Sequence, residues 1–123
     1  MKIAIVGCRD LGGYPYSDFC THIPQNCTVV ISGGARGIDS YARRYAVEND
    51  IPLAEMRPDY GAHPGRSAPI VRNREIVEAA DYVLAFWDGK SRGTRHVIGY
   101  CMETQKAFRI IDITKGYAHS VYA

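Results

Sequence analysis

The sequence predicts an α/β protein, a Rossmann-like three-layer sandwich built on a mainly parallel five-stranded sheet. Five short apolar segments alternate with segments of helical periodicity. The apolar segments are continuous rather than alternating, as at residues 3–6, which is typical of parallel strands covered on both faces. Such alternation of strands and helices implies right-handed crossovers, with helices on both sides of the sheet.

The first half of the chain supplies three of the expected strands. A strand at 2–7 is followed by a turn-rich segment and by a short helix at 16–22, which ends before Pro24. A strand at 28–32 leads into a helix at 37–49, where apolar residues recur at the helical spacing. Pro52 separates this helix from a third strand at 53–57.

The second half repeats the pattern after a long connection at 58–67. A helix at 68–80, a strand at 82–86, a helix at 94–104 and a strand at 108–113 follow. We therefore expect one domain at 1–113 and a C-terminal tail at 114–123, where no period is visible. Because long connections in small domains are often functional, we expect 58–67 to be a mobile cover over a ligand site, with Arg66 contributing charge, and a packed surface loop is the alternative.

Composition narrows the class of protein. At 123 residues the chain has room for one core, and its formal net charge of +2 argues against nucleic acid as a partner. No apolar run could span a bilayer and no signal peptide is visible, so we expect a cytoplasmic protein. The four cysteines have no C-x-x-C spacing, which favours reduced thiols and no metal site.

The glycine-rich turn at 32–37 is the main candidate for a binding site. It joins a buried strand to a helix, so its backbone amides and the helix N-terminus are suited to a phosphate. It matches neither G-x-G-x-x-G nor the P-loop pattern. Arg36 could pair with the phosphate or be solvated, and Asp39 is more readily explained as a helix cap than as a catalytic group.

A second turn, at 89–94, repeats this logic after the fourth strand and adds the hydroxyls of Ser91 and Thr94. Two such turns at one sheet edge would flank a single crevice. Asn73 lies on the apolar stripe of the third helix, where it could meet a ligand or a neighbouring loop. Phe86 and Trp87 could stack on a base or pack at the strand end.

No catalytic group can be assigned from the sequence. The turns hold no paired carboxylates, and neither His63 nor His96 has the spacing of a metal ligand. Ser32 is not part of a G-x-S-x-G elbow. The sequence therefore leaves open whether the protein is an enzyme.

The segment at 30–40 resembles the signature of the SLOG superfamily, named for the Smf/DNA-processing protein A and LOG families. The segments at 7–9, 72–77 and 91–95 are similar to the small single-domain, YspA-like branch. The resemblance implies a Rossmann-like fold that binds nucleotides or their derivatives, such as NAD or ADP-ribose, with no required cofactor. The ligand-binding residues indicated by the turns and the resemblance together are Gly7, Cys8, Arg9, Ser32, Gly33, Gly34, Arg36, Gly37, Arg72, Asn73, Ser91, Arg92, Gly93 and Thr94.

The resemblance also distinguishes between the possible functions of the chain. LOG proteins are phosphoribohydrolases with the signature Pro-Gly-Gly-x-Gly-Thr-x-x-Glu, in which Gly93 and Thr94 match but Val97 stands in place of the glutamate. The first hypothesis is binding of a small phosphorylated ligand by a sensor or carrier. The second is a hydrolase acting on an N-glycosidic or phosphate bond, and the third is a single-stranded nucleic-acid module. A homo-oligomer is left open.

Overall fold

The computed structural model describes residues 1–115 and 120–122 of the chain. It contains one sheet in the order β3-β2-β1-β4-β5-β6. The strands are β1 (Lys2–Gly7), β2 (Val29–Ser32), β3 (Leu53–Glu55), β4 (Tyr82–Trp87), β5 (Phe108–Asp112) and β6 (Ser120–Tyr122). The helices are α1 (Tyr16–Thr21), α2 (Ile38–Glu48), α3 (Ser67–Ala79) and α4 (Arg92–Thr104), with a 3₁₀ turn at Ile113–Lys115. The predicted fold class is confirmed.

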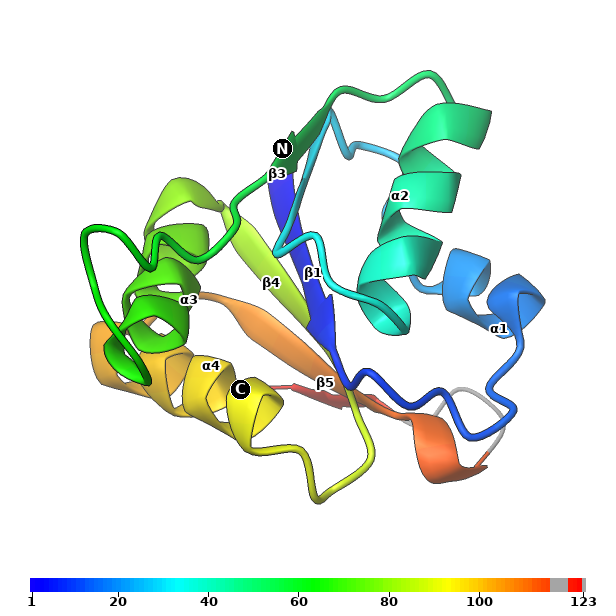
Figure 1. Cartoon of the computed structure of the whole chain (residues 1–123). Helices are drawn as coiled ribbons and strands as arrows, with labels where there is room; N and C mark the ends of the chain where they lie inside the picture. The colour runs from blue at the N-terminus through cyan, green and yellow to red at the C-terminus, as the bar shows by residue number, and fades with distance from the viewer. Residues whose placement is uncertain (116–119, 123) are drawn as a thin grey trace.

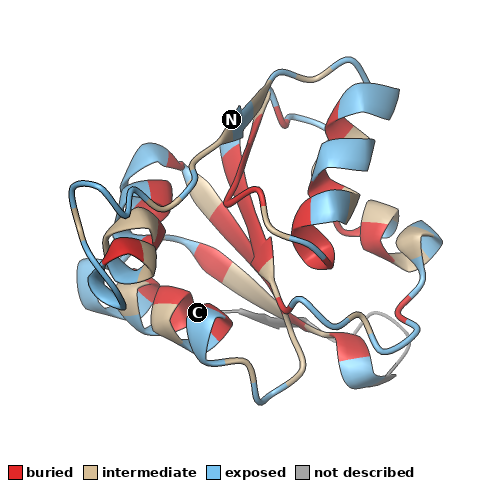
Figure 2. Cartoon of the chain, viewed as in Figure 1, coloured by how far each residue is buried: buried red, intermediate tan, exposed pale blue. Residues whose placement is uncertain are grey.

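Helices cover both faces of the sheet, α1 and α2 on one side and α3 and α4 on the other (Figure 1). The residues of β1 show why. Ile3 and Ile5 pack in the cluster that includes α1 and α2 residues, whereas Ala4 and Val6 pack with α3 and α4. Successive side chains of a strand point to opposite faces, so a continuous apolar strand supplies two cores. The central strands are accordingly buried along most of their length (Figure 2).

The sheet has one strand more than the five we expected. β1 to β5 are parallel, as predicted, and β6 pairs antiparallel with β5, with Ile110 opposite Val121. β6 comes from the segment at 114–123 for which we expected only a tail, so that expectation is corrected in part. Three residues are too short for periodicity to show, and pairing with the edge of β5 is what orders them. Residues 116–119 and 123 lie outside the described part of the chain.

The strand order places a topological switch point between β1 and β4. From β1 the chain moves outward through β2 to β3, and then returns to pair β4 with the other side of β1. In open α/β sheets, the crevice beyond the carboxyl ends of the strands at such a point is the usual ligand site. None of the helices in the described part of the chain is long and apolar enough to cross a membrane.

Candidate functional site

A cavity of about 350 Å³ lies at this switch point. The segment after β1, both glycine-rich turns and the first half of α3 contribute to its wall. Nine of the residues expected from the sequence line it: Gly7, Cys8, Arg9, Gly33, Arg72, Asn73, Ser91, Gly93 and Thr94. The expectation that the two turns flank one crevice therefore agrees with the geometry, and the volume falls in the usual range for small-molecule sites.

The other five expected residues lie outside this cavity. Gly34 and Arg36 line a separate, more open concavity beside it. Ser32 is fully buried, and its Oγ accepts a hydrogen bond from the Gly34 amide at 3.3 Å. Arg92 is exposed at the start of α4. Their assignment as ligand contacts stays a prediction.

Gly37 has a packing role that the sequence did not reveal. Its φ is +73°, and a Cβ there would lie 2.5 Å from the carbonyl oxygens of both Cys8 and Arg9. The next residue, Ile38, donates its amide to Cys8 O at 3.2 Å. Gly37 thus allows the start of α2 to pack directly on the backbone that follows β1.

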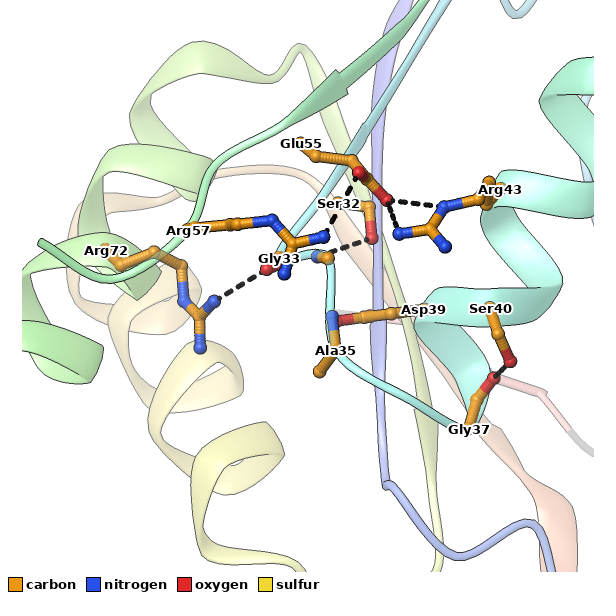
Figure 3. Close-up of polar contacts among 11 residues, drawn as sticks. Ser32, Gly33, Ala35, Gly37, Asp39, Ser40, Arg43, Glu55, Arg57 and Arg72 are labelled. Carbon is orange, nitrogen blue, oxygen red and sulfur yellow. Dashed lines mark hydrogen bonds and ion pairs between the residues drawn. The ribbon is translucent and has the colours of Figure 1, made fainter.

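The glycine-rich turn at 32–37 uses much of its own hydrogen-bonding capacity (Figure 3). The amide of Gly34 donates to Ser32 Oγ, that of Ala35 donates to Asp39 Oδ2 at 3.0 Å, and that of Ile38 donates to Cys8 O. Asp39 also brings a carboxylate into the first turn of α2, where its negative charge offsets the positive end of the helix dipole. The turn therefore has fewer amide groups to offer a phosphate than its sequence suggested.

The N-terminus of α4 is more open. Asp88 Oδ1 accepts the amides of Lys90 and Ser91, both at 2.8 Å, which shapes the turn before the helix. The first turn of α4 then has no side-chain cap and no acidic residue. Its first backbone bond runs from Arg95 N to Ser91 O, so the amides of residues 92–94 have no intrahelical acceptor. A Cβ on Gly93 would meet nothing within 4 Å.

Arg72 and Asn73 connect α3 to the turn at 32–37. Arg72 donates from Nη1 to Gly33 O at 3.0 Å and to Met56 O at 3.4 Å, and from Nε to Asn73 Oδ1 at 2.9 Å. Within the described residues, Nη2 has no hydrogen-bond partner. Burial lowers the pKa of Arg72, and the nearby Asp39 carboxylate offsets part of that effect. The buried Asn73 thus lines the cavity and accepts a hydrogen bond from Arg72, and its contact with a ligand or a neighbouring loop stays a prediction.

Three carboxylates, Asp10, Asp39 and Asp88, also line the cavity. We expected no paired carboxylates in the turns. Asp10 and Asp88 follow β1 and β4, and only the pairing of these two strands brings them together. Burial raises the pKa of Asp39, whereas the amides of Ser91 and Lys90 lower that of Asp88. The sequence alone did not show that β1 lies next to β4, and this pairing is what places Asp10 and Asp88 in one cavity.

Four further residues clarify the chemistry. Cys8 lines the cavity, but burial and then Asp88 raise the pKa of its thiol to about 11, so it is a poor nucleophile near neutral pH. Val97 also faces the cavity and is buried.

Phe86 is buried in the core, and Trp87 donates its Nε1 to Ser91 O at 3.0 Å. Packing, rather than base stacking, accounts for both aromatic residues.

The connection at 58–67 folds on itself. Asp59 Oδ1 accepts the amides of Gly61 and Ala62, and Ser67 Oγ donates to Pro64 O at 2.8 Å. None of these residues lines the cavity, although Pro69 of the following helix does. The expectation that this loop closes over a ligand stays a prediction. Among the described residues, no group of three His, Cys, Asp or Glu side chains could hold a metal ion.

Fold and cavity together define a Rossmann-like α/β domain with a polar crevice at its switch point. Residues 1–56 match the family model described as DNA recombination-mediator protein A. The chain is also 46% identical over 86 residues to the Gene 61 protein of Mycobacterium phage D29, an alignment that covers 64% of this chain and 65% of the phage protein.

Solved structures agree with this assignment of the fold. DNA processing protein A from Streptococcus pneumoniae matches with a TM-score of 0.71 and 20% identity, over 89% of this chain and 50% of that one. A molybdenum cofactor binding protein from Rippkaea orientalis matches at 0.65 and 18%, over 91% and 77%. DNA processing protein A from Helicobacter pylori, in a structure concerned with its single-stranded DNA binding mode, matches at 0.63 and 23%, over 94% and 70%.

The chain therefore has a SLOG-type fold, and the resemblance stated from its motifs is confirmed. At these identities the structures establish the fold alone, and the chain spans about half of the pneumococcal protein and about two thirds of the phage protein. The YspA-like branch stays a prediction. One expectation changes: because a protein with the same fold binds single-stranded DNA, the small net charge is not by itself an argument against a nucleic-acid partner.

Proposed function

We propose that the cavity binds a nucleotide or a nucleotide-derived ligand, with a phosphate at the N-terminus of α4. The observation that carries the proposal is the uncapped first turn of this helix, whose amides at 92–94 lack intrahelical acceptors while Gly93 and Thr94 line the cavity. Such an N-terminus combines free N–H groups with the positive end of the helix dipole. Arg9 and the unbonded Nη2 of Arg72 add positive charge in the same cavity.

The rest of the cavity suits a neutral, hydroxyl-rich group. Asp10, Asp39 and Asp88 would repel a ligand that is anionic throughout, but carboxylates accept hydrogen bonds from sugar hydroxyls. A ligand that combines phosphate with ribose hydroxyls satisfies both parts of the wall. This is why a nucleotide of the NAD or ADP-ribose type is favoured over a simple inorganic anion.

The residues of the cavity favour ligand binding without a chemical reaction. Val97 faces the cavity at the position of the glutamate in LOG hydrolases, and an aliphatic side chain cannot act as acid or base. This favours a sensor or carrier role over a LOG-type hydrolase. Incubation with nucleoside monophosphates is expected to release no free base above background, and release that depends on Gly93 would instead support the hydrolase hypothesis.

The test is a thermal-shift screen over AMP, ADP-ribose and NAD, followed by calorimetry with Gly93→Asp. Because a Cβ at Gly93 meets nothing within 4 Å and acidic residues suit a first helical turn, this variant should fold. Its carboxylate occupies the anion site, and loss of charge-assisted bonds predicts at least about tenfold weaker binding.

Gly99→Asp is the matched control, since it adds the same charge to an exposed site on the same helix where a Cβ also meets nothing within 4 Å. Its affinity should stay within about twofold of the parent protein, because it lies outside the cavity. If Gly93→Asp binds as well as Gly99→Asp does, the phosphate does not lie at the α4 N-terminus.

Single-stranded nucleic acid is the second candidate. It is supported by the shared fold with a DNA-binding relative and by an arginine-lined concavity next to the cavity. Fluorescence anisotropy with a labelled oligothymidylate distinguishes the two. A small-ligand protein should bind it weakly and lose it at moderate salt, whereas tight binding at physiological salt would favour the nucleic-acid function.

A further inference from the structure

A second concavity, of about 480 Å³, lies beside the main cavity. Its wall is almost entirely basic. Arg9, Arg36, Arg43 and Arg57 line it together with Gly34 and Ala35, and no carboxylate is part of the lining. Four guanidinium groups from separate parts of the chain converge there, so the surface attracts negatively charged groups.

Glu55 balances only part of this charge (Figure 3). Arg43 donates from Nε and Nη2 to Glu55 Oε2, at 2.9 and 2.7 Å, and is fixed by this pair. Arg57 approaches the other oxygen of the same carboxylate only to 3.5 Å, and its side chain is 61% exposed. Within the described residues, Arg9 and Arg36 form no ion pair. Three positive charges are therefore left facing the concavity.

The two hollows are parts of one surface. Arg9 and Ala35 line both of them, so no wall of intervening residues divides one from the other. Two successive glycines mark the boundary. A Cβ on Gly33 would lie 3.1 Å from Arg72 Cζ, and a Cβ on Gly34 would lie 3.1 Å from Arg57 Cζ. Since neighbouring Cα atoms are about 3.8 Å apart, the two guanidinium carbons are at most about 13 Å apart.

We propose that the arginine concavity is a second anion subsite of the same ligand site, so that the ligand is a nucleotide with two phosphate groups. One phosphate lies at the α4 N-terminus and the other lies against Arg57, Arg36 and Arg9. The inference rests on the proposed function, because it extends the ligand from the main cavity. Because Arg9 and Ala35 line both hollows, one small molecule can extend from the main cavity into the concavity.

The carboxylates of the main cavity favour a small molecule over a polymer. A strand with a phosphate at every unit would carry negative charge past Asp10, Asp39 and Asp88. A ligand with two phosphates and a neutral sugar between or beside them avoids this repulsion. A second phosphate could belong to a pyrophosphate or to the far side of the sugar, and both share the same chemistry.

The experiment compares three probes by calorimetry: AMP, ADP and adenosine 3′,5′-bisphosphate. At least one of the two probes with a second phosphate should bind about tenfold or more tightly than AMP, the range expected of charge-assisted hydrogen bonds. The tighter of the two shows which linkage the site accepts. Arg57→Ala should remove this gain and leave AMP within about twofold, because Arg57 does not line the main cavity.

Arg44→Ala is the control for charge. Arg44 is also exposed, but it pairs with Glu48 on α2 and lines neither hollow. It should keep the gain in affinity. Equal affinities for all three probes, or equal losses in Arg57→Ala and Arg44→Ala, would overturn the second subsite while leaving AMP binding intact. Failure of every probe to bind would contradict the proposed function itself, and an oligonucleotide that binds far more tightly through Arg57 would overturn the small-molecule occupant.

Discussion

Gly37→Ala separates the packing role of Gly37 from a role in ligand contact. The sequence alone suggests a folded variant with weaker binding, since the glycine lies in a phosphate-type turn. The structure predicts an unstable variant instead. With φ at +73°, an alanine is strained, and its Cβ would lie 2.5 Å from two carbonyl oxygens. Backbone strain costs about 1–3 kcal/mol and overpacking another ~1–3 kcal/mol.

The free energy of unfolding should therefore fall by about 2–6 kcal/mol, a large part of the stability of a small domain. Urea denaturation followed by circular dichroism measures it. With a slope of about 1–3 kcal/mol per molar urea, a loss of ~3 kcal/mol lowers the midpoint by about 1–3 M. Ligand affinity at low urea is expected to follow the folded fraction, with no separate loss.

Gly99→Ala is the matched control. Gly99 is exposed inside α4, and a Cβ there meets nothing within 4 Å, so alanine should raise stability by up to about 1 kcal/mol through its helix propensity. A Gly37→Ala variant with the midpoint of the parent protein would refute the packing role. Normal stability together with lost binding would restore Gly37 as a ligand contact.

Further predictions concern the cavity wall and the loop beside it. Arg72→Ala should lower the free energy of unfolding by about 1–3 kcal/mol, because Gly33 O and Met56 O lose their donor, and an unchanged urea midpoint would contradict those bonds. The thiol of Cys8 should react with iodoacetamide at pH 8 more slowly than that of the half-buried Cys20, and equal rates would contradict its burial. Because the pKa of Cys8 is 9.0 when unfolded and about 11 when folded, its contribution to stability should be complete below pH 9 and decrease as the pH rises to about 11, which pH-dependent urea titrations of the parent protein and Cys8→Ser compare. Hydrogen exchange at 61–67 should slow on ligand binding, and Arg66→Ala should weaken affinity by about 1–3 kcal/mol, whereas no change in either leaves the loop without a role.

The local pattern of residues was enough to predict the sandwich and most of its elements. Continuous apolar strands such as β1 and β4 must be covered on both faces, and this follows from composition over a few residues. Element ends differ by a few residues at most: β3 ends at Glu55 rather than at 57, and α4 begins at Arg92 rather than at 94. The glycine-rich turns also mark the correct edge of the sheet, because parallel strands bring all their carboxyl ends together.

Contacts between residues that are distant in the sequence determined the features that local sequence patterns could not reveal. The antiparallel β6 depends on the edge of β5, and the meeting of Asp10 with Asp88 depends on β1 lying next to β4. Hydrogen-bond partners also decided which turn has free amides for an anion. The amides at 34, 35 and 38 have acceptors within the protein, whereas those at 92–94 have none within their helix. Periodicity and turn chemistry act between neighbours in sequence, whereas strand order, packing against Gly37 and the pairing of a buried amide depend on residues that are distant in the chain.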